Sequence, residues 1–188
     1  MGGNSGRCSH GALSPWRRKC ALAPRFCHVR LTDVKGRYPR RPPRLLTVFQ
    51  NVRPLFFVTF NTYRRQLLLA NDDIHRVWLK FAGNGSAHGA WVGRYVLMPD
   101  HVHLFVELTE QTDLARWIQA AKSVIGKELL RLGNPKPHWQ EGLFDHLLRR
   151  DESYAEKWEY VRQNPVRQGL CVRPEDWPYQ GEVNELVW

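Results

Sequence analysis

Residues 100–108 read Asp-His-Val-His-Leu-Phe-Val-Glu-Leu, a run that is typical of a buried β-strand except for its two histidines. Successive side chains of a strand point to opposite faces, so His101 and His103 share one face and the apolar residues the other: Val102, Leu104, Val106 and Leu108. The two imidazoles would lie roughly 6 to 7 Å apart at Cα, close enough to bind one metal ion. A solvated histidine face is the alternative, and the His-x-His spacing alone does not decide between them.

The segments around this strand predict an α+β domain with an antiparallel sheet. Turn and cap signals divide the chain into a strand at 55–60, a helix from the Asn71-Asp72-Asp73 cap to Gly83, a strand at 91–98 that Pro99-Asp100 turns into the histidine strand, a helix from Thr112 or Asp113 to Gly133, a strand at 138–148, and a helix from Ser153 to Pro165. The order β-α-β-β-α-β is that of a ferredoxin-like sandwich with helices on one face of the sheet, here followed by an added C-terminal helix.

Charge and composition separate a basic tail from the rest of the chain. The 188 residues are 43% hydrophobic, enough for one domain with a core. Residues 1–46 carry eleven Lys and Arg against one acid, Asp33, which accounts for the whole net charge of +10. We therefore expect 1–46 to be a largely disordered tail and 47–188 to be the folded domain. The tail is either an electrostatic arm for polyanions or sequence without a function of its own.

Targeting and cysteine patterns favour a cytoplasmic protein. The chain has no signal-peptide pattern and no run of about 18 apolar residues. Its four cysteines form no CxxC motif and no regular framework, which argues against disulfides and against a structural zinc site. We expect a cytoplasmic location in association with the nucleoid.

The predicted last helix carries a tyrosine and an asparagine that are suited to chemistry. Tyr154, Trp158 and Val161 form its apolar stripe, whereas Tyr160 lies on the polar face, with Asn164 one turn further on. Core filling is the usual role of a helical tyrosine, but this position does not favour it. The Asn164 amide oxygen is a neutral ligand suited to Mg²⁺ or Mn²⁺, and the residue could also end the helix beside Pro165.

These motifs together resemble the REP-associated tyrosine transposases, which belong to the HUH single-strand transposases and nucleases. The resemblance extends over about residues 50–180 and rests on four segments in order: Tyr-Val-Leu-Met-Pro-Asp-His-Val-His-Leu-Phe-Val (95–106), Trp-Gln-Glu-Gly (139–142), Asp-His (145–146) with Arg149, and Tyr-Val-Arg-Gln-Asn-Pro-Val-Arg-Gln-Gly-Leu (160–170).

The resemblance implies a role for each matched residue. His101 and His103 correspond to the HUH metal ligands, Asn164 to the third ligand, and Tyr160 to the nucleophile that forms a 5′-phosphotyrosine. The implied cofactor is a divalent ion, Mg²⁺ or Mn²⁺, and the implied substrates are palindromic repeats that fold as hairpins in single-stranded DNA. Some relatives build the site across a homodimer, and the sequence does not separate this arrangement from a monomer.

Further residues are candidates for contacts with DNA. Asp100 is a candidate to orient a ligand histidine, but the turn after Pro99 explains this residue equally well. His146 is a candidate for a phosphate contact or a structural histidine rather than for a ligand. The basic candidates for phosphate contacts are Arg64, Arg65, Arg149, Arg150, Arg162 and Arg167. The candidates for stacking on bases are Trp139, Trp177 and Tyr179, although the core must claim most aromatic residues.

The sequence leaves three possible functions open. The first is a metal-dependent DNA transposase or endonuclease that cleaves and rejoins hairpin-forming single strands. The second is a non-catalytic, domesticated module that binds palindromic repeats. The third is a metal-dependent hydrolase, which would need the two histidines but not Tyr160.

Overall fold

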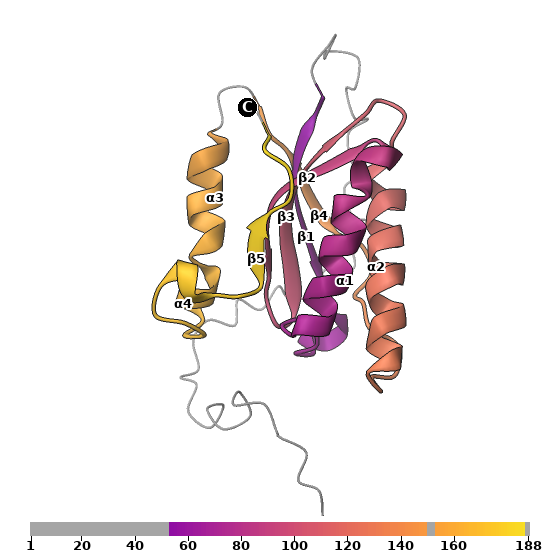
Figure 1. The fold of residues 1–188 in the computed structure, drawn as a ribbon, viewed down its shortest axis with the longest axis vertical. Coiled ribbons are helices and arrows are strands. Elements are labelled where there is room, and N and C mark those ends of the chain that lie inside the picture. The colour runs from indigo at the N-terminus through magenta and orange to yellow at the C-terminus, as the bar shows by residue number, and fades with distance from the viewer. Residues whose placement is uncertain (1–52, 150–152, 187–188) are drawn as a thin grey trace, which may run out of the picture. The chain divides into compact units, whose positions relative to one another are not determined.

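A five-stranded antiparallel sheet forms the centre of the domain, with helices on both of its faces (Figure 1). The computed structural model describes residues 53–149 and 153–186. The predicted tail, residues 1–46, and Arg150 lie outside these ranges. The strands are β1 (Leu55–Asn61), β2 (Ala90–Leu97), β3 (His101–Leu108), β4 (Phe144–Leu147) and β5 (Gln180–Glu182), and the helices are α1 (Asp72–Gly83), α2 (Leu114–Arg131), α3 (Tyr154–Arg162) and α4 (Asn164–Arg167).

The strand order β4-β1-β3-β2-β5 confirms the predicted ferredoxin-like arrangement. β3 lies between β1 and β2 and is antiparallel to both, with Thr59 opposite His103 on one side and Val96 opposite it on the other. Strand alternation gives the sheet two different faces. The β3 side chains that face α1 and α2 are all apolar, namely Val102, Leu104, Val106 and Leu108, and they join the larger core cluster.

Local sequence signals fix where α1 and α2 begin. The Asn71 side chain accepts a hydrogen bond from the backbone N–H of Ile74, and the Asp113 side chain accepts one from the N–H of Arg116. Each cap satisfies a free donor of the first turn. The apolar stripes of both helices then pack on the sheet, where Trp78 and Ile118 are fully or almost fully buried. These two helices cover the face that the strand alternation makes apolar.

α3 packs on the opposite face of the sheet, at an irregular point of β2. The pairing of β2 with β3 shifts register between Val92 and Tyr95, and Gly93 lies in this bulge. A side chain at Gly93 would approach the Tyr154 hydroxyl to 2.8 Å and Leu186 to 2.5 Å. Tyr154 packs edge-on against Phe105, with ring centroids 4.8 Å apart, and its hydroxyl accepts a hydrogen bond from the Arg94 N–H at 3.1 Å.

Three features differ from the sequence-based expectation. The strand expected over 138–148 is formed only by Phe144–Leu147. Pro165 does not close α3, which ends at Arg162, but lies in the first turn of α4, where a missing N–H costs nothing. β5 was not predicted, and it pairs with β2 through three residues of low strand propensity. No helix in the described ranges has the length and apolarity needed to cross a membrane.

Candidate active site

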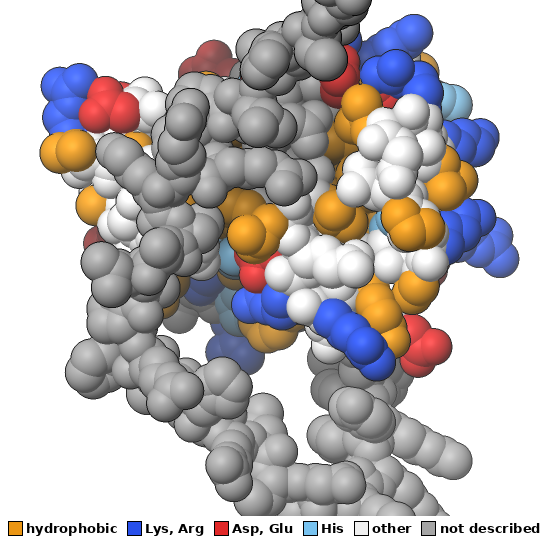
Figure 2. Space-filling model, turned by 90° about the horizontal axis from the view of Figure 1, so that it is seen from below, with side chains coloured by type: hydrophobic (Ala, Val, Ile, Leu, Met, Phe, Trp, Pro, Cys, Tyr) orange, Lys and Arg blue, Asp and Glu red, His pale blue; other side chains and the backbone are white. Residues whose placement is uncertain are grey.

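The two histidines lie at the beginning of β3, on the face opposite α1 and α2. His101 is 6% exposed, and His103 is half-buried. Both point to the side of Phe105, as the alternation of the strand predicts. Figure 2 looks onto this end of the domain and shows histidine, acidic and basic side chains next to one another near the centre of the view. The fold therefore places the two imidazoles, one buried and one half-buried, beside charged side chains.

The two imidazoles face each other through their Nε2 atoms, which are 3.0 Å apart. Their outer nitrogens are both engaged: His101 Nδ1 lies 2.5 Å from Asp100 Oδ1, and His103 Nδ1 lies 2.7 Å from Thr59 Oγ1. Phe57 stacks on the His103 ring at an angle of 19°. Each ring is therefore held by an oxygen atom at its Nδ1, while its Nε2 points at the other ring.

The turn that carries Asp100 is fixed by the segment that follows β1. The Thr62 N–H and hydroxyl both donate to the Asp100 carbonyl at 2.9 Å. The N–H groups of Leu68 and Leu69 donate to the Pro99 carbonyl. Arg65 forms an ion pair with Asp100 Oδ2 at 3.4 Å, from a backbone with φ of 58° that non-glycine residues rarely adopt. The Asp100 carboxylate is thus oriented toward His101 by several independent contacts.

Electrostatics keep His103 in the neutral form that a metal ligand needs. Burial and, to a smaller extent, the charges of His101 and Arg65 lower the pKa of His103 to about 3, although Asp100 opposes this shift. Burial alone would raise the pKa of Asp100, but the hydrogen bond with His101 and the charges of His101 and Arg65 outweigh it, so this pKa is lowered. An ionised Asp100 only accepts hydrogen bonds, so His101 Nδ1 carries the proton, and in the neutral ring Nε2 has a lone pair.

His103 has two ways to complete this arrangement. Its Nε2–H can donate to His101 Nε2, with Thr59 donating to Nδ1, or its Nδ1–H can donate to Thr59 and leave both Nε2 lone pairs facing one point. The Thr59 hydroxyl rotates to serve either tautomer. In the second state the two lone pairs repel each other unless a cation lies between them.

The donor set fits part of a divalent metal site. Metal-binding histidines usually donate their second ring N–H to a carboxylate or another oxygen, as His101 does to Asp100. Within the described ranges, no group of three or more His, Cys, Asp and Glu side chains could hold a metal ion. A third ligand from the described part of the chain would have to be of another type, and the asparagine amide is such a type.

Tyr160 and Asn164 lie on α3 and α4, at the end of the sheet where β3 begins (Figure 1). Tyr160 is 65% exposed, and the Arg167 guanidinium lies 4.1 Å above its ring centroid while donating to the Tyr160 carbonyl. The Asn164 Nδ2 donates to the Val161 carbonyl at 2.8 Å. Among the described residues no hydrogen bond or ring contact joins either side chain to the histidine pair. The phenol is accessible, as its polar-face position predicted.

The predicted DNA-contacting residues are distributed over several elements. Arg65 reaches the histidine site, and Arg64 lies beside it with its guanidinium over the Tyr63 ring. His146 lies opposite Phe57 in the β1–β4 pairing, on the same face as His103, and Arg149 is exposed just after β4. Arg162 forms an ion pair with Glu159 at 2.7 Å.

Two of the three predicted base-stacking residues belong to the core instead. Trp139 packs edge-on against Phe60, and its ring N–H donates to the Lys122 carbonyl at 2.9 Å. Trp177 is 5% exposed, and its ring N–H donates to the Leu97 carbonyl. Tyr179 is partly buried, with its ring against those of Trp177 and His75. An exposed aromatic ring on which a nucleobase could stack must therefore come from another residue.

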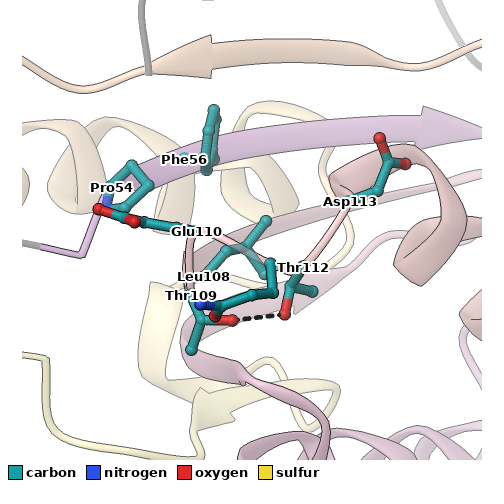
Figure 3. A pocket seen from close by; sticks show the side chains of 8 residues that line it. Pro54, Phe56, Leu108, Thr109, Glu110, Thr112 and Asp113 are labelled. Atoms are coloured by element: carbon teal, nitrogen blue, oxygen red, sulfur yellow. Dashed lines mark hydrogen bonds between the residues drawn. The ribbon is translucent and has the colours of Figure 1, made fainter. Parts of the chain in front are cut away.

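A pocket lies at the other end of the sheet and is not part of this site. Its walls come from the beginning of β1, the end of β3 and the turn before α2, where the Thr109 and Thr112 hydroxyls are 2.8 Å apart (Figure 3). From His101 to Leu108 the strand advances by about 23 Å. The histidine site therefore lies far from the pocket, on the opposite end of the same strand.

Sequence reasoning missed Thr59, which holds His103 from the neighbouring strand. Its signal was weak but present: Thr59 interrupts the apolar run Leu-Phe-Phe-Val-Thr-Phe and falls on the face of β1 that carries Phe57. Only the register between β1 and β3 shows that this hydroxyl meets His103. A polar residue inside an otherwise apolar strand is informative once its cross-strand partner is known.

The segment that contains strands β1 to β4 and the two histidines is similar to a transposase family. Residues 55–147 match the model of the family described as "Transposase IS200 like". The match runs from β1 to β4 and includes both histidines, while α3 follows it.

Similarity to individual proteins confirms the resemblance to REP-associated tyrosine transposases. A Haemophilus influenzae protein that carries this name is 32% identical over 94 residues, which are 44% of this chain and 53% of that protein. The REP-associated tyrosine transposase of Escherichia coli is 28% identical over 90 residues, 47% of this chain and 52% of that protein. The chain thus spans about half the length of the curated relatives it matches.

A solved structure supports the fold. The structure of a REP-associated tyrosine transposase bound to a REP hairpin aligns with a TM-score of 0.53 and 23% identity, over 70% of this chain and 80% of that one. At this identity the likeness concerns the fold alone.

Proposed function

We propose that this protein is a metal-dependent DNA transposase or endonuclease that cleaves and rejoins hairpin-forming single-stranded DNA through Tyr160. The observation that carries the proposal is the histidine pair, whose Nε2 atoms converge at 3.0 Å while Asp100 and Thr59 hold the outer nitrogens. The relatives named as tyrosine transposases, one of them solved with a REP hairpin, supply the substrate class.

In this proposal His101, His103 and Asn164 hold a divalent ion, Mg²⁺ or Mn²⁺. When bound, such an ion polarises a scissile phosphate and stabilises negative charge on the departing oxygen. His103 contributes a neutral imidazole because its pKa is far below neutral pH. Asp100 keeps the proton of His101 on Nδ1, which leaves Nε2 free to bind the ion.

Tyr160 is the proposed nucleophile. Its phenolic oxygen attacks phosphorus and forms the new O–P bond, while the bond from phosphorus to the 3′-oxygen breaks. The phenol gives up its proton, and the departing 3′-oxygen gains one. One phosphodiester is exchanged for another, so rejoining by a 3′-hydroxyl is the reverse reaction and needs no external energy source.

The placement of α3 supports this role. Figure 1 shows that α3 ends near the end of the sheet where β3 begins, so its last turn and the histidine pair lie at the same end of the domain. The Tyr160 side chain is 65% exposed, so its phenol is accessible to a DNA strand. The tyrosine can serve the histidine pair of its own chain or that of a second copy.

A covalent adduct is the test. Purified protein is incubated with a 5′-labelled and a 3′-labelled single-stranded hairpin in Mn²⁺, and the products are separated under denaturing conditions. We expect a protein–DNA adduct that retains the 3′ label. This adduct should not form with the Tyr160→Phe protein, and it should not form when a chelator removes the metal. Tyr154→Phe is the matched control, because Tyr154 is a buried tyrosine of the same helix, and it should retain the adduct.

The competing functions give different results in the same assay. Cleavage that survives Tyr160→Phe would indicate a hydrolase that uses activated water. Hairpin binding without cleavage in any divalent metal would indicate a binding module. Mixing Tyr160→Phe with His103→Ala protein then separates the two assemblies: adduct formed only by the mixture means that the tyrosine is donated to the partner's histidine pair.

A further inference from the structure

Only two aromatic side chains of the described residues are exposed, and one of them has no role in the mechanism above. These are Tyr160, 65% exposed, and Phe144, 59% exposed. Phe144 is the first residue of β4, a strand at the edge of the sheet. Single exposed apolar residues are common on protein surfaces, so exposure alone says little. The position of Phe144 relative to the histidine pair is more informative.

Phe144 lies in the same row of the sheet as His103. The register places Phe144 opposite Thr59 on β1, and Thr59 opposite His103 on β3. Directly paired residues have their side chains on the same face, so all three point toward the side of the sheet that carries the site. At about 4.8 Å between neighbouring strands, Phe144 and His103 are about 10 Å apart at Cα, which is within the reach of one or two nucleotides.

An aromatic surface connects the two residues. The Phe57 ring stacks on the His103 ring at 19°, and the Phe144 ring meets Phe57 edge-on at 68° with centroids 6.3 Å apart. Phe144 thus extends the aromatic contacts of the site toward solvent. Arg149 is exposed two residues after β4, where it can contact a backbone phosphate.

We propose that Phe144 is a stacking platform for the base of an unpaired nucleotide next to the scissile phosphate. The inference rests on the proposed function, because the histidine pair defines where that phosphate lies. Proteins that hold single-stranded DNA use exposed aromatic rings on which bases stack, and such contacts tolerate different sequences because every base has a π-face. The occupant is therefore a nucleobase of any identity, and Phe144 favours unpaired over paired DNA at this edge of the sheet.

Binding of DNA to Phe144→Ala tests the inference in a Tyr160→Phe background, which prevents covalent capture. The probes are a hairpin with no extension, the same hairpin with a short unpaired extension on its 5′ or 3′ side, and an unpaired oligonucleotide. We expect Phe144→Ala to weaken binding to one extended hairpin and to the oligonucleotide by about 5- to 20-fold, in the lower part of the range for one stacked base. Binding to the hairpin without an extension should not change.

Three variants and the salt dependence separate stacking from other effects. Phe144→Trp should restore binding, because it retains a ring. Leu130→Ala removes an exposed apolar side chain of α2, 46% exposed on the other face, and should change no affinity. The slope of log Kd against log salt should be the same for Phe144→Ala and its parent, since stacking neutralises no phosphate, whereas Arg149→Ala should reduce it.

Failure of the inference differs from failure of the proposed function. If Phe144→Ala binds every probe as its parent does, the stacking role is wrong although hairpin binding persists. A second outcome is that the Tyr160→Phe parent protein binds the unpaired oligonucleotide but not the hairpin, and that Phe144→Ala weakens this binding. In that case the proposed hairpin substrate is wrong, and the stacking role of Phe144 is supported. If the parent binds no DNA, both are wrong.

Discussion

The packing of α3 on the sheet can be tested by removing one oxygen atom, the hydroxyl of Tyr154. Its hydroxyl accepts a hydrogen bond from the Arg94 N–H in the β2 bulge, at 3.1 Å, and its ring packs on Phe105. Tyr154→Phe keeps the ring and leaves the N–H without this acceptor. Because an unsatisfied buried donor costs about 1–3 kcal/mol, the free energy of unfolding at pH 8 should fall by that amount.

Alkaline pH adds a second, independent signature. Burial raises the pKa of Tyr154 to about 12, while its ordinary value is 10.0. Between these values the folded protein keeps a proton that the unfolded chain has lost, so stability falls as pH rises from 10 through 12. At pH 11 the loss from Tyr154 is about 1.4 kcal/mol. Tyr154→Phe lacks this loss, so its deficit relative to the wild type should narrow by about 1.4 kcal/mol between pH 8 and pH 11.

Urea unfolding followed by circular dichroism at both pH values measures the two effects. Burial raises the pKa of Tyr95 to about 12 as well, but Tyr95 is present in both proteins and cancels in the comparison. Tyr160→Phe is the matched control: its ring is exposed, so stability should not change at either pH. A deficit for Tyr154→Phe that stays constant from pH 8 to pH 11 would refute a buried, neutral phenol at this position.

Two further substitutions probe the site and its support. Asp100→Asn removes the negative charge next to His101 Nδ1. Mn²⁺ binding measured by calorimetry should weaken about 10- to 100-fold, which is the usual effect of losing such a partner of a ligand histidine. Equal affinity of the two proteins for Mn²⁺ would contradict an orienting role for this carboxylate. Gly93→Ala would bring a methyl group to 2.5 Å from Leu186 and 2.8 Å from Tyr154, so it should lower the free energy of unfolding by about 1–3 kcal/mol. Gly83→Ala has open space around it and serves as the neutral control, and an equal effect of both would contradict the close approach at the bulge.

The order of the elements could be predicted because local signals agree with the global fold. The caps at Asn71, Asp113 and Ser153 each accept the hydrogen bond that their sequence predicts, and the alternation of β3 sorts its side chains as expected. These features depend on neighbours within four residues or on strand period, both of which can be read directly from the sequence.

The parts that could not be predicted depend on contacts between distant segments. The strand expected over 138–148 is short, and in the segment before it the carbonyls of Gln140 and Gly142 accept hydrogen bonds from the buried Lys122 Nζ, a contact with α2 that no local pattern indicates. Trp139 is partly buried and Trp177 is buried, and their ring N–H groups donate to carbonyls of α2 and β2. Thr59 and Phe144 gain their positions at the site from strand register, which no local pattern specifies.

The same alternation that builds the core also determines which face of the sheet carries the two histidines. Because Val102 and Leu104 must face α1 and α2, His101 and His103 must face away from them, together with Thr59 and Phe144 on the neighbouring strands. A slip of one residue between β1 and β3 would exchange the two sets and bury imidazoles in the core, which makes the register energetically costly to change. α3, which packs on the histidine face through Tyr154, places the proposed nucleophile Tyr160 on that side of the sheet.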